Sequence, residues 1–248
     1  MVAAKTPSAR WVDLNADLGE GGAHDAELLA IVTSANVCSG AYAGGAALTT
    51  ATMAAAAAQG IRLGAHVGYP DREGFGRRPM RLSAAALRES LDRQVGACRT
   101  AAHRAGGRLD YLKPHGALYH AAVEPSVAAE VLLACARASE LALLHQPGTA
   151  LASAASAVGV VCHAEGFADR RYLPNGRLVP RGEPEALVLD PGEVARQAVR
   201  LVRDGVGAYA VHSLCLHGDQ AEARANATRV RDILLREGYA LRTPNFPR

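Results

Sequence analysis

The stretch V-D-L-N-A-D-L-G-E, from Val12 to Glu20, decides how the rest of this chain is interpreted. Apolar and polar residues alternate along it, which is the period-two pattern of a β-strand with two different faces. A strand that faces water normally shows lysine, threonine, glutamate or arginine, whereas this polar face carries short carboxylates and an amide. The residues of that face are Asp13, Asn15 and Asp17.

A glycine, Gly19, and a further carboxylate, Glu20, follow this strand directly. Short acidic side chains at the end of a strand are typical of a site floor in an α/β protein, because ligands collect at the carboxyl ends of parallel strands. The alternative is an edge strand whose polar face lies in solvent. These residues alone leave both interpretations open.

The composition excludes some classes of protein. The chain has 248 residues, enough for one large α/β domain or two small ones. Its 49% hydrophobic and 21% charged residues exclude disorder as the main state. Because the net charge is only +3 and no basic run is interleaved with aromatic residues, we expect no nucleic-acid partner.

The five cysteines are scattered, without the paired spacing of a zinc ribbon or a disulfide framework. Reduced thiols in a cytoplasmic protein are the simplest interpretation. The first ten residues lack the apolar segment of a signal peptide, and no stretch approaches the roughly 20 apolar residues that a membrane span requires. We therefore expect a soluble, cytoplasmic protein with no membrane partner.

Strand-like and helix-like segments alternate without a linker, which predicts one parallel α/β domain over residues 1–248. Seven such units favour an irregular, closed or nearly closed β/α barrel over an open sheet. The expected strands are Val12–Leu18, Val32–Val37, Ile61–His66, Leu109–Lys113, Leu141–His145, Val160–Ala164 and Tyr209–Leu216. The expected helices are His24–Ile31, Ala46–Gln59, Ser83–Ala105, Val127–Ala138, Thr149–Val158, Pro191–Arg203 and Ala221–Arg236.

Polar residues stand at or just beyond the carboxyl ends of the expected strands. In a β/α barrel those ends face one mouth, so residues about 200 positions apart converge there. One such residue would mean little, but seven in register are hard to attribute to chance. They are Asp17, Asn36, His66, Lys113 with His115, Glu165 and His217.

The first candidate for chemistry is a set of carboxylates and imidazoles, Asp17 and Glu20 with His66 and His115, which Lys113 completes as the expected catalytic set. An amide-opening hydrolase needs a base to activate water and an acid to protonate the leaving nitrogen, and Asp with His supplies both near neutral pH. The same residue types suit a divalent metal. Against both, a lone histidine is more often structural.

The second candidate is cationic and lies in glycine- and proline-rich loops beside the strand ends. Planar guanidinium groups suit the clamping of a carboxylate or a phosphoryl group, although they can instead pair with loop aspartates. The arginines are Arg77, Arg78, Arg170 and Arg181. The expected substrate-binding set also contains Asn15, Asn36, Tyr69, Asp71, Glu165, Asp169, His217 and Asp219.

Two other chemistries lack support. Gly40–Gly45 matches neither a Walker loop nor a G-x-G-x-x-G turn, so a nucleotide site on this chain is not expected. There is no G-x-S-x-G elbow, and Ser34, Ser39 and Cys38 have no placed base that would make one of them a nucleophile.

Several long motifs run in order over nearly the whole chain and are more specific than any single pattern. They are D-L-N-A-D-L-G-E, T-S-A-N, G-A-H-V-G-Y-P-D with G-F-G-R-R-P-M, K-P-H-G-A-L-Y, E-G-F-A-D-R-R-Y, L-V-P-R and C-L-H-G-D. Together they resemble the LamB/YcsF family, the A subunits of bacterial ATP-dependent 5-oxoprolinases.

The resemblance implies a seven-stranded barrel like those of glycoside hydrolases and deacetylases. It also implies the conversion of 5-oxoproline, ATP and water to glutamate, ADP and phosphate, with ATP entering through partner subunits B and C. A lactam is a stable amide, and phosphorylation of its carbonyl oxygen would create a leaving group. The acid–base set would then open the ring while arginines hold the carboxylate or the phosphoryl group.

One segment departs from the family pattern. The family typically reads S-A-N-I-A-C-G-F-H-A-G-D, but this chain reads S-A-N-V-C-S-G-A-Y-A-G-G, so Tyr42 replaces a histidine and Gly45 an aspartate. Tyrosine is a poor base near neutral pH, and glycine has no side chain. Two further hypotheses therefore stay open beside the family function: a stand-alone metal-dependent amidase or deacetylase, and a regulatory homologue without turnover.

Overall fold

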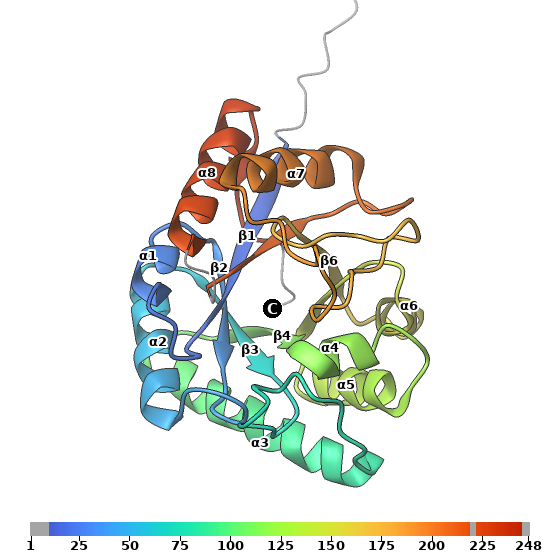
Figure 1. Cartoon of the computed structure of the whole chain (residues 1–248). Helices are drawn as coiled ribbons and strands as arrows, with labels where there is room; N and C mark the ends of the chain where they lie inside the picture. The colour runs from blue at the N-terminus through green and yellow to red at the C-terminus, as the bar shows by residue number, and fades with distance from the viewer. Residues whose placement is uncertain (1–9, 219–221, 245–248) are drawn as a thin grey trace, which may run out of the picture.

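The strand that carries the alternating stretch, β1 (Trp11–Leu18), pairs in parallel with a strand on each side. The computed structural model describes residues 10–218 and 222–244. In it, β1 joins β2 and β7, and the strands between these two pair in chain order, so that seven strands close into a barrel (Figure 1). The other strands are β2 (Ser34–Cys38), β3 (Arg62–Val67), β4 (Leu109–Pro114), β5 (Ala142–His145), β6 (Cys162–Phe167) and β7 (Ser213–His217).

The predicted seven-stranded β/α barrel is therefore confirmed, with one addition. A two-residue strand, β8 (Ala240–Leu241), pairs with Trp11 and Val12, where β1 begins before its pairing with β2 and β7. Two residues have no detectable period, so the sequence pattern did not predict this strand.

Helices surround the strands (Figure 1), and side-chain caps define where several of them begin. Ser83, Ser126 and Asp190 each accept a hydrogen bond from the backbone N–H three residues later. All seven expected helices are present with small shifts at their ends; Ala221, where the last was expected to begin, lies outside the described residues. The helices are α1 (Asp25–Leu29), α2 (Ala46–Ala58), α3 (Ala84–Arg104), α4 (Gly116–Ala121), α5 (Val127–Ala138), α6 (Ala150–Ala157), α7 (Pro191–Asp204) and α8 (Ala223–Arg236).

The polar face of β1 points into the barrel. Asp13, Asn15 and Asp17 are 1%, 0% and 8% exposed. Asn15 lies opposite Ser34 and Asp17 lies opposite Asn36, and all four side chains are buried. The main apolar core contains Val12, Leu14, Ala16 and Leu18 of β1 together with residues of the helices. The alternative of an edge strand whose polar face lies in solvent is therefore wrong.

Two expected strands are displaced along the chain. β6 extends to Phe167 because its last residues pair with β7, so that Glu165 lies inside the strand rather than beyond it. β7 begins at Ser213 and not at Tyr209, because Tyr209 forms a tight antiparallel bridge with Val206 that satisfies its backbone groups.

The short helix α4 was not expected from the sequence. It begins at Gly116, whose φ is 50°, and a Cβ at this position would lie 2.6 Å from the carbonyl oxygen of Gly76. Only glycine fits such a turn without strain. The turn fixes the direction of His115, the residue between β4 and α4.

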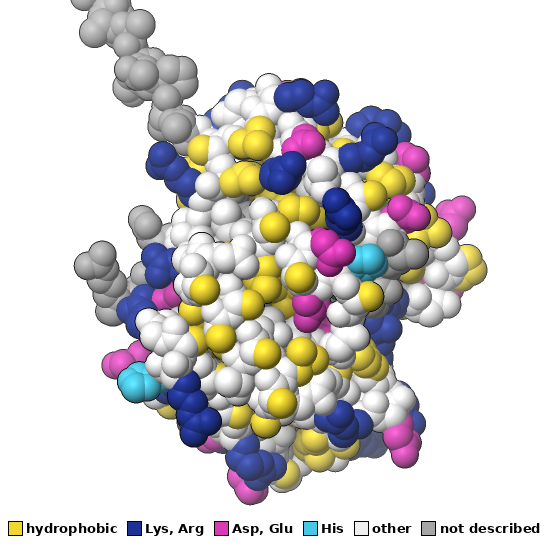
Figure 2. Space-filling view, turned by 90° about the vertical axis from the view of Figure 1, so that its left-hand side faces the viewer, with side chains coloured by type: hydrophobic (Ala, Val, Ile, Leu, Met, Phe, Trp, Pro, Cys, Tyr) yellow, Lys and Arg dark blue, Asp and Glu magenta, His cyan; other side chains and the backbone are white. Residues whose placement is uncertain are grey.

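None of the helices in the described part of the chain is long and apolar enough to cross a membrane. Figure 2 shows the outer face on the side of α1 and α2, where basic and acidic side chains are scattered among apolar ones rather than gathered by sign.

Candidate active site

A cavity of about 820 Å³ opens at the carboxyl ends of the barrel strands. Its volume falls within the range of pockets that hold small molecules. Apolar side chains such as Phe167 and Leu178 form part of the wall. The charged and imidazole side chains that line it are Asp17, Glu20, His66, Arg77, Lys113, His115, His120, Arg170, Arg181 and His217.

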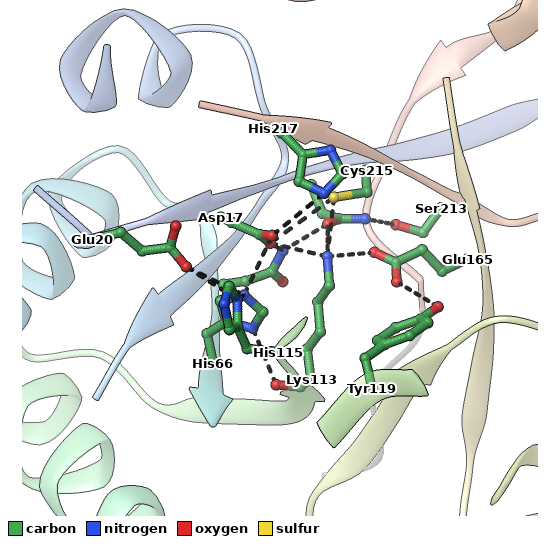
Figure 3. Close-up of polar contacts among 12 residues, drawn as sticks. Asp17, Glu20, His66, Lys113, His115, Tyr119, Glu165, Ser213, Cys215 and His217 are labelled. Carbon is green, nitrogen blue, oxygen red and sulfur yellow. Dashed lines mark hydrogen bonds and ion pairs between the residues drawn. The ribbon is translucent and has the colours of Figure 1, made fainter. Parts of the chain in front are cut away.

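The barrel brings carboxylates and imidazoles together at the floor of this cavity (Figure 3). His66 Nε2 lies 3.3 Å from Asp17 Oδ2 and 3.6 Å from Glu20 Oε1. His115 Nδ1 lies 3.4 Å from Glu20 Oε1 and 3.1 Å from His66 Nε2. One ligand atom from each of these four residues lies within 4.8 Å of the others.

The hydrogen bonds of the two imidazoles determine which nitrogens face one another. His66 Nδ1 lies 3.1 Å from the carbonyl oxygen of Lys113, and His115 Nε2 lies 2.9 Å from that of Phe75. A carbonyl oxygen only accepts, so these two nitrogens carry hydrogen and donate. When both rings are neutral, His66 Nε2 and His115 Nδ1 direct lone pairs at each other and at the carboxylates of Asp17 and Glu20. Only a proton or a metal cation between these atoms removes the repulsion among them.

The pKa values of the two histidines move in opposite directions. Burial lowers the pKa of His66, but the adjacent Asp17 and Glu20 more than offset this and raise it above its usual value. Burial, and then the charge of His66, lower the pKa of His115 well below its usual value. Burial raises the pKa of Asp17, but His66 and Lys113 hold it well below its usual range. In the absence of a metal, the shared proton therefore resides on His66.

Lys113 lies beneath Asp17 and is only 1% exposed. Burial opposes the charge on this ammonium, but Asp17, Cys215 and Glu165 together outweigh burial and raise the pKa of Lys113 well above its usual value. The lysine therefore stays charged and keeps Asp17 ionised. Its Nζ lies 3.0 Å from Asp17 Oδ1, 2.7 Å from Glu165 Oε1, 3.2 Å from Asn15 Oδ1 and 3.0 Å from Cys215 Sγ.

A third imidazole, His217, enters the cavity from the end of β7. Its Nδ1 lies 2.8 Å from Asp169 Oδ2, and its ring stacks on Phe167. These contacts direct Nε2 toward Asp17 Oδ2, 4.0 Å away. Asp169 therefore acts as the orienting partner of His217 and does not line the cavity itself.

Amide side chains below the site hold Asp17 in place. Asn36 Nδ2 donates to Asp17 Oδ1 at 2.8 Å and to Asn15 Oδ1 at 2.6 Å, while Tyr111 Oη donates to Asn36 Oδ1 at 2.6 Å. The ring of Tyr111 reaches this position because residue 64 is glycine; a Cβ on Gly64 would lie 2.2 Å from it. Neither asparagine, each expected to bind substrate, lines the cavity.

The arginines expected to bind substrate divide into two groups. Arg77, Arg170 and Arg181 line the cavity. Arg78 does not, because its guanidinium forms an ion pair with Asp71, as the structural alternative for these arginines anticipated. Of the other expected residues, Tyr69 is buried outside the cavity lining, Glu165 lies below it against Lys113, and Asp219 lies outside the described residues.

Comparison with known proteins gives the family. The model of the LamB/YcsF family matches residues 12–246. The chain belongs to the LamB/YcsF family. A relative from Methylococcus capsulatus, named as the A subunit of 5-oxoprolinase, is 45% identical over 245 residues, which cover 93% of this chain and 94% of that protein.

Two solved structures agree with the fold. The lactam utilization protein from Thermus thermophilus superposes with a TM-score of 0.86 at 35% identity, covering 94% of this chain and 99% of that one. The catalytic domain of a peptidoglycan N-acetylglucosamine deacetylase from Eubacterium rectale is 12% identical with a TM-score of 0.53, covering 97% and 91%. The LamB/YcsF chain thus shares the deacetylase type of barrel.

The departure from the family pattern falls inside the site. Tyr42 is 1% exposed and stacks on His115, with ring centroids 3.9 Å apart. Its hydroxyl donates to Glu20 Oε1 at 2.8 Å. Gly45 caps α2, and a Cβ there would meet nothing within 4 Å. The tyrosine therefore supports both a carboxylate and an imidazole of the floor, and the position of Gly45 has room for a larger side chain.

Three aromatic or imidazole side chains that line the cavity were not expected from the sequence. Tyr119 donates from its hydroxyl to Glu165 Oε2 at 3.2 Å, and His120 and Phe167 lie nearby in the lining. Their positions in the sequence were the available signal. Tyr119 ends the motif K-P-H-G-A-L-Y, His120 is the next residue, and Phe167 belongs to the motif E-G-F-A-D-R-R-Y.

Proposed function

We propose that this chain is the A component of an ATP-dependent 5-oxoprolinase, which opens the lactam of 5-oxoproline to give glutamate while ATP is converted to ADP and phosphate. The observation that carries the proposal is the convergence of Asp17, Glu20, His66 and His115 at the floor of a cavity large enough for a small lactam. The full-length similarity to proteins named as 5-oxoprolinase A subunits supports it.

The opposite pKa shifts of the two histidines suggest their roles in a metal-free site. Opening an amide requires a base that takes a proton from water and an acid that protonates the leaving nitrogen. His115, whose pKa is lowered, is neutral and presents Nδ1 as the base. His66, whose pKa is raised beside Asp17, carries the proton on Nε2 and serves as the acid. Pairs of groups whose pKa values are pushed apart are typical of acid–base sites.

The same four residues fit a divalent cation, and we propose them as its ligands. The fit rests on donor chemistry: two carboxylates and two imidazole lone pairs converge, and the far N–H of each imidazole is fixed by a carbonyl oxygen. A bound ion would replace the shared proton, polarise an amide carbonyl and lower the pKa of water. Metal analysis of the purified protein separates these two states of the site.

We propose that subunits B and C of the complex supply the ATP-dependent step. Relatives of this chain are named as one lettered subunit of 5-oxoprolinase, which implies further subunits for those proteins. The sequence contains no phosphate-binding loop, so ATP would act through the complex. Its five cysteines are free thiols, which is in keeping with a cytoplasmic location.

The test is glutamate release from 5-oxoproline and ATP by this chain mixed with B and C subunits from the same genome, with each component omitted in turn. Asp17→Asn and His115→Ala are expected to abolish release without unfolding the barrel. The matched control is His103→Ala, a histidine exposed on α3. Wild-type rates in both site variants would refute the assignment.

Tyr42 and Gly45 give the regulatory alternative its own test. No glutamate release, with the active A component of a relative as the positive control, would favour a different lactam or a role without turnover. A gain in rate on Tyr42→His combined with Gly45→Asp would instead identify the native chain as a weakened enzyme.

A further inference from the structure

Arg170 is a buried cation in the lining of the cavity. It is only 3% exposed and lies in the segment that follows β6. Its Nη2 donates to the carbonyl oxygen of Val179 at 2.7 Å and its Nε to that of Ala186 at 3.3 Å. Within the described part of the chain, no carboxylate forms an ion pair with it. Carbonyl oxygens fix the guanidinium but do not neutralise its charge.

The surroundings of Arg170 add positive potential. Burial and then the neighbouring Arg181 lower the pKa of Arg170, and the attraction of Asp169 is weaker than this repulsion. Asp169 is in any case engaged by His217 at 2.8 Å. Burial, together with the two arginines, lowers the pKa of His120 to about 4, so this imidazole stays neutral at pH 7. An isolated buried charge is costly, and an anionic ligand would remove that cost.

The cavity therefore has two poles of different chemistry. One pole, from β1, β3 and β4, holds Asp17, His66 and His115 and suits an amide group. The other, from the segment after β6, holds Arg170 and suits an anion. Apolar side chains complete the lining between charged ones, which suits a small hydrocarbon ring.

We infer that Arg170 binds the carboxylate of the substrate and restricts this site to lactams that carry one. The inference rests on the proposed function, since 5-oxoproline is a five-membered lactam with a carboxylate. A guanidinium held by two carbonyl oxygens is pre-oriented for hydrogen bonding to a carboxylate, and such charge-assisted bonds are stronger than neutral ones. A lactam without the carboxylate leaves the buried charge unneutralised.

The experiment is calorimetric titration of the isolated full chain with 5-oxoproline and with 2-pyrrolidinone, the same ring without the carboxylate. The wild type is expected to bind 5-oxoproline at least about tenfold more tightly. Arg170→Gln is expected to lose most of that preference, and Arg170→Lys to recover part of it. Arg78→Gln is the matched control, because that arginine pairs with Asp71 outside the cavity.

The comparison of the two ligands uses only the wild-type chain, so it still tests the inference if Arg170→Gln fails to fold. Equal affinities, no binding of 5-oxoproline, or an unchanged preference in a folded Arg170→Gln chain would overturn the inference. Competition by inorganic phosphate that Arg170→Gln abolishes, without a preference for 5-oxoproline, would assign the subsite to a phosphoryl group instead.

The two proposals fail separately. Arg170-dependent binding of 5-oxoproline without glutamate release from the complex would refute the proposed function alone. Glutamate release that Arg170→Gln leaves at the wild-type KM would refute the carboxylate assignment alone.

Discussion

The buried lysine below the site gives the sharpest test of the electrostatics. Lys113 and Glu165 are 1% and 0% exposed, and Lys113 Nζ lies 2.7 Å from Glu165 Oε1 and 3.0 Å from Asp17 Oδ1. Among the described residues, Glu165 Oε1 makes no hydrogen bond of good geometry, so this attraction is chiefly electrostatic. Lys113→Met keeps the length of the side chain and removes its charge, which leaves the buried Glu165 without its cation and Asp17 with only His66 as a close cationic partner in the described chain.

The expected cost follows from these distances. At an effective dielectric constant of about 20, each contact contributes roughly 6 kcal/mol of gross attraction, most of which offsets the desolvation of the three charges. Removing one partner of a buried pair leaves the desolvation cost unmatched, so Lys113→Met is expected to lower the free energy of unfolding by about 3–5 kcal/mol. Glu165→Gln should cost less, because Asp17 still faces the lysine.

The two substitutions should not be additive, because each removes the same interaction. The double variant is expected to lose about 2 kcal/mol less than the sum of the single ones. Urea unfolding followed by circular dichroism at pH 7 measures all four proteins. The matched control is the exposed pair Arg93 and Glu89 on α3, for which Arg93→Met with Glu89→Gln should show a coupling below about 1 kcal/mol. Additive losses at the buried pair, or a loss below about 1 kcal/mol for Lys113→Met, would refute the reasoning.

Four further outcomes are expected. Burial raises the pKa of Asp13 from 3.8 to about 6, so the folded chain holds this proton more tightly. The stability that this proton contributes should therefore fall by about 2.4 kcal/mol as the pH rises from 4 to 7, and a stability difference from Asp13→Asn that does not change with pH would contradict this. Burial raises the pKa of Glu20, and the hydrogen bond from Tyr42 lowers it, so Tyr42→Phe should move the acid limb of the pH–rate profile to higher pH. An acid limb at the wild-type pH would show that the ionisation of Glu20 does not produce that limb. Gly116→Ala should cost about 1–3 kcal/mol in thermal unfolding and reduce turnover, because it strains the turn beside the site; an unchanged Tm would exclude that strain. Mass-spectrometric metal analysis should find a divalent ion that His66→Ala loses and His103→Ala retains, and an equal metal content in the two variants would argue against the proposed ligands.

Several features of the site could be predicted because they depend on short-range pattern. The alternation in β1 placed Asp17 on one face of a strand, and parallel strands made the positions of His66 and His217 at strand ends meaningful. The β-strand period and the barrel geometry require no knowledge of contacts, so the pattern was sufficient.

The roles of the arginines could not be predicted in the same way. Arg78 and Arg170 both follow strands in polar loops, yet one pairs with Asp71 and the other is buried without a carboxylate partner in the described chain. The difference depends on which groups lie within about 4 Å in space, a distance that one sequence does not report. Tyr42 is similar, since its stacking on His115 and its hydrogen bond to Glu20 exist only in the folded chain.

The sequence by itself determined the alternating strands, the seven-stranded parallel barrel and the gathering of carboxylates and imidazoles at one end, because periodicity and strand direction are local properties of the chain. Only the tertiary structure decided that His66 and His115 face each other with opposite pKa shifts, that Lys113 lies buried beneath Asp17, and that Arg170 faces the cavity. Those features arise from desolvation and from distances of a few ångströms between segments far apart in the chain, which exist only once the barrel has closed.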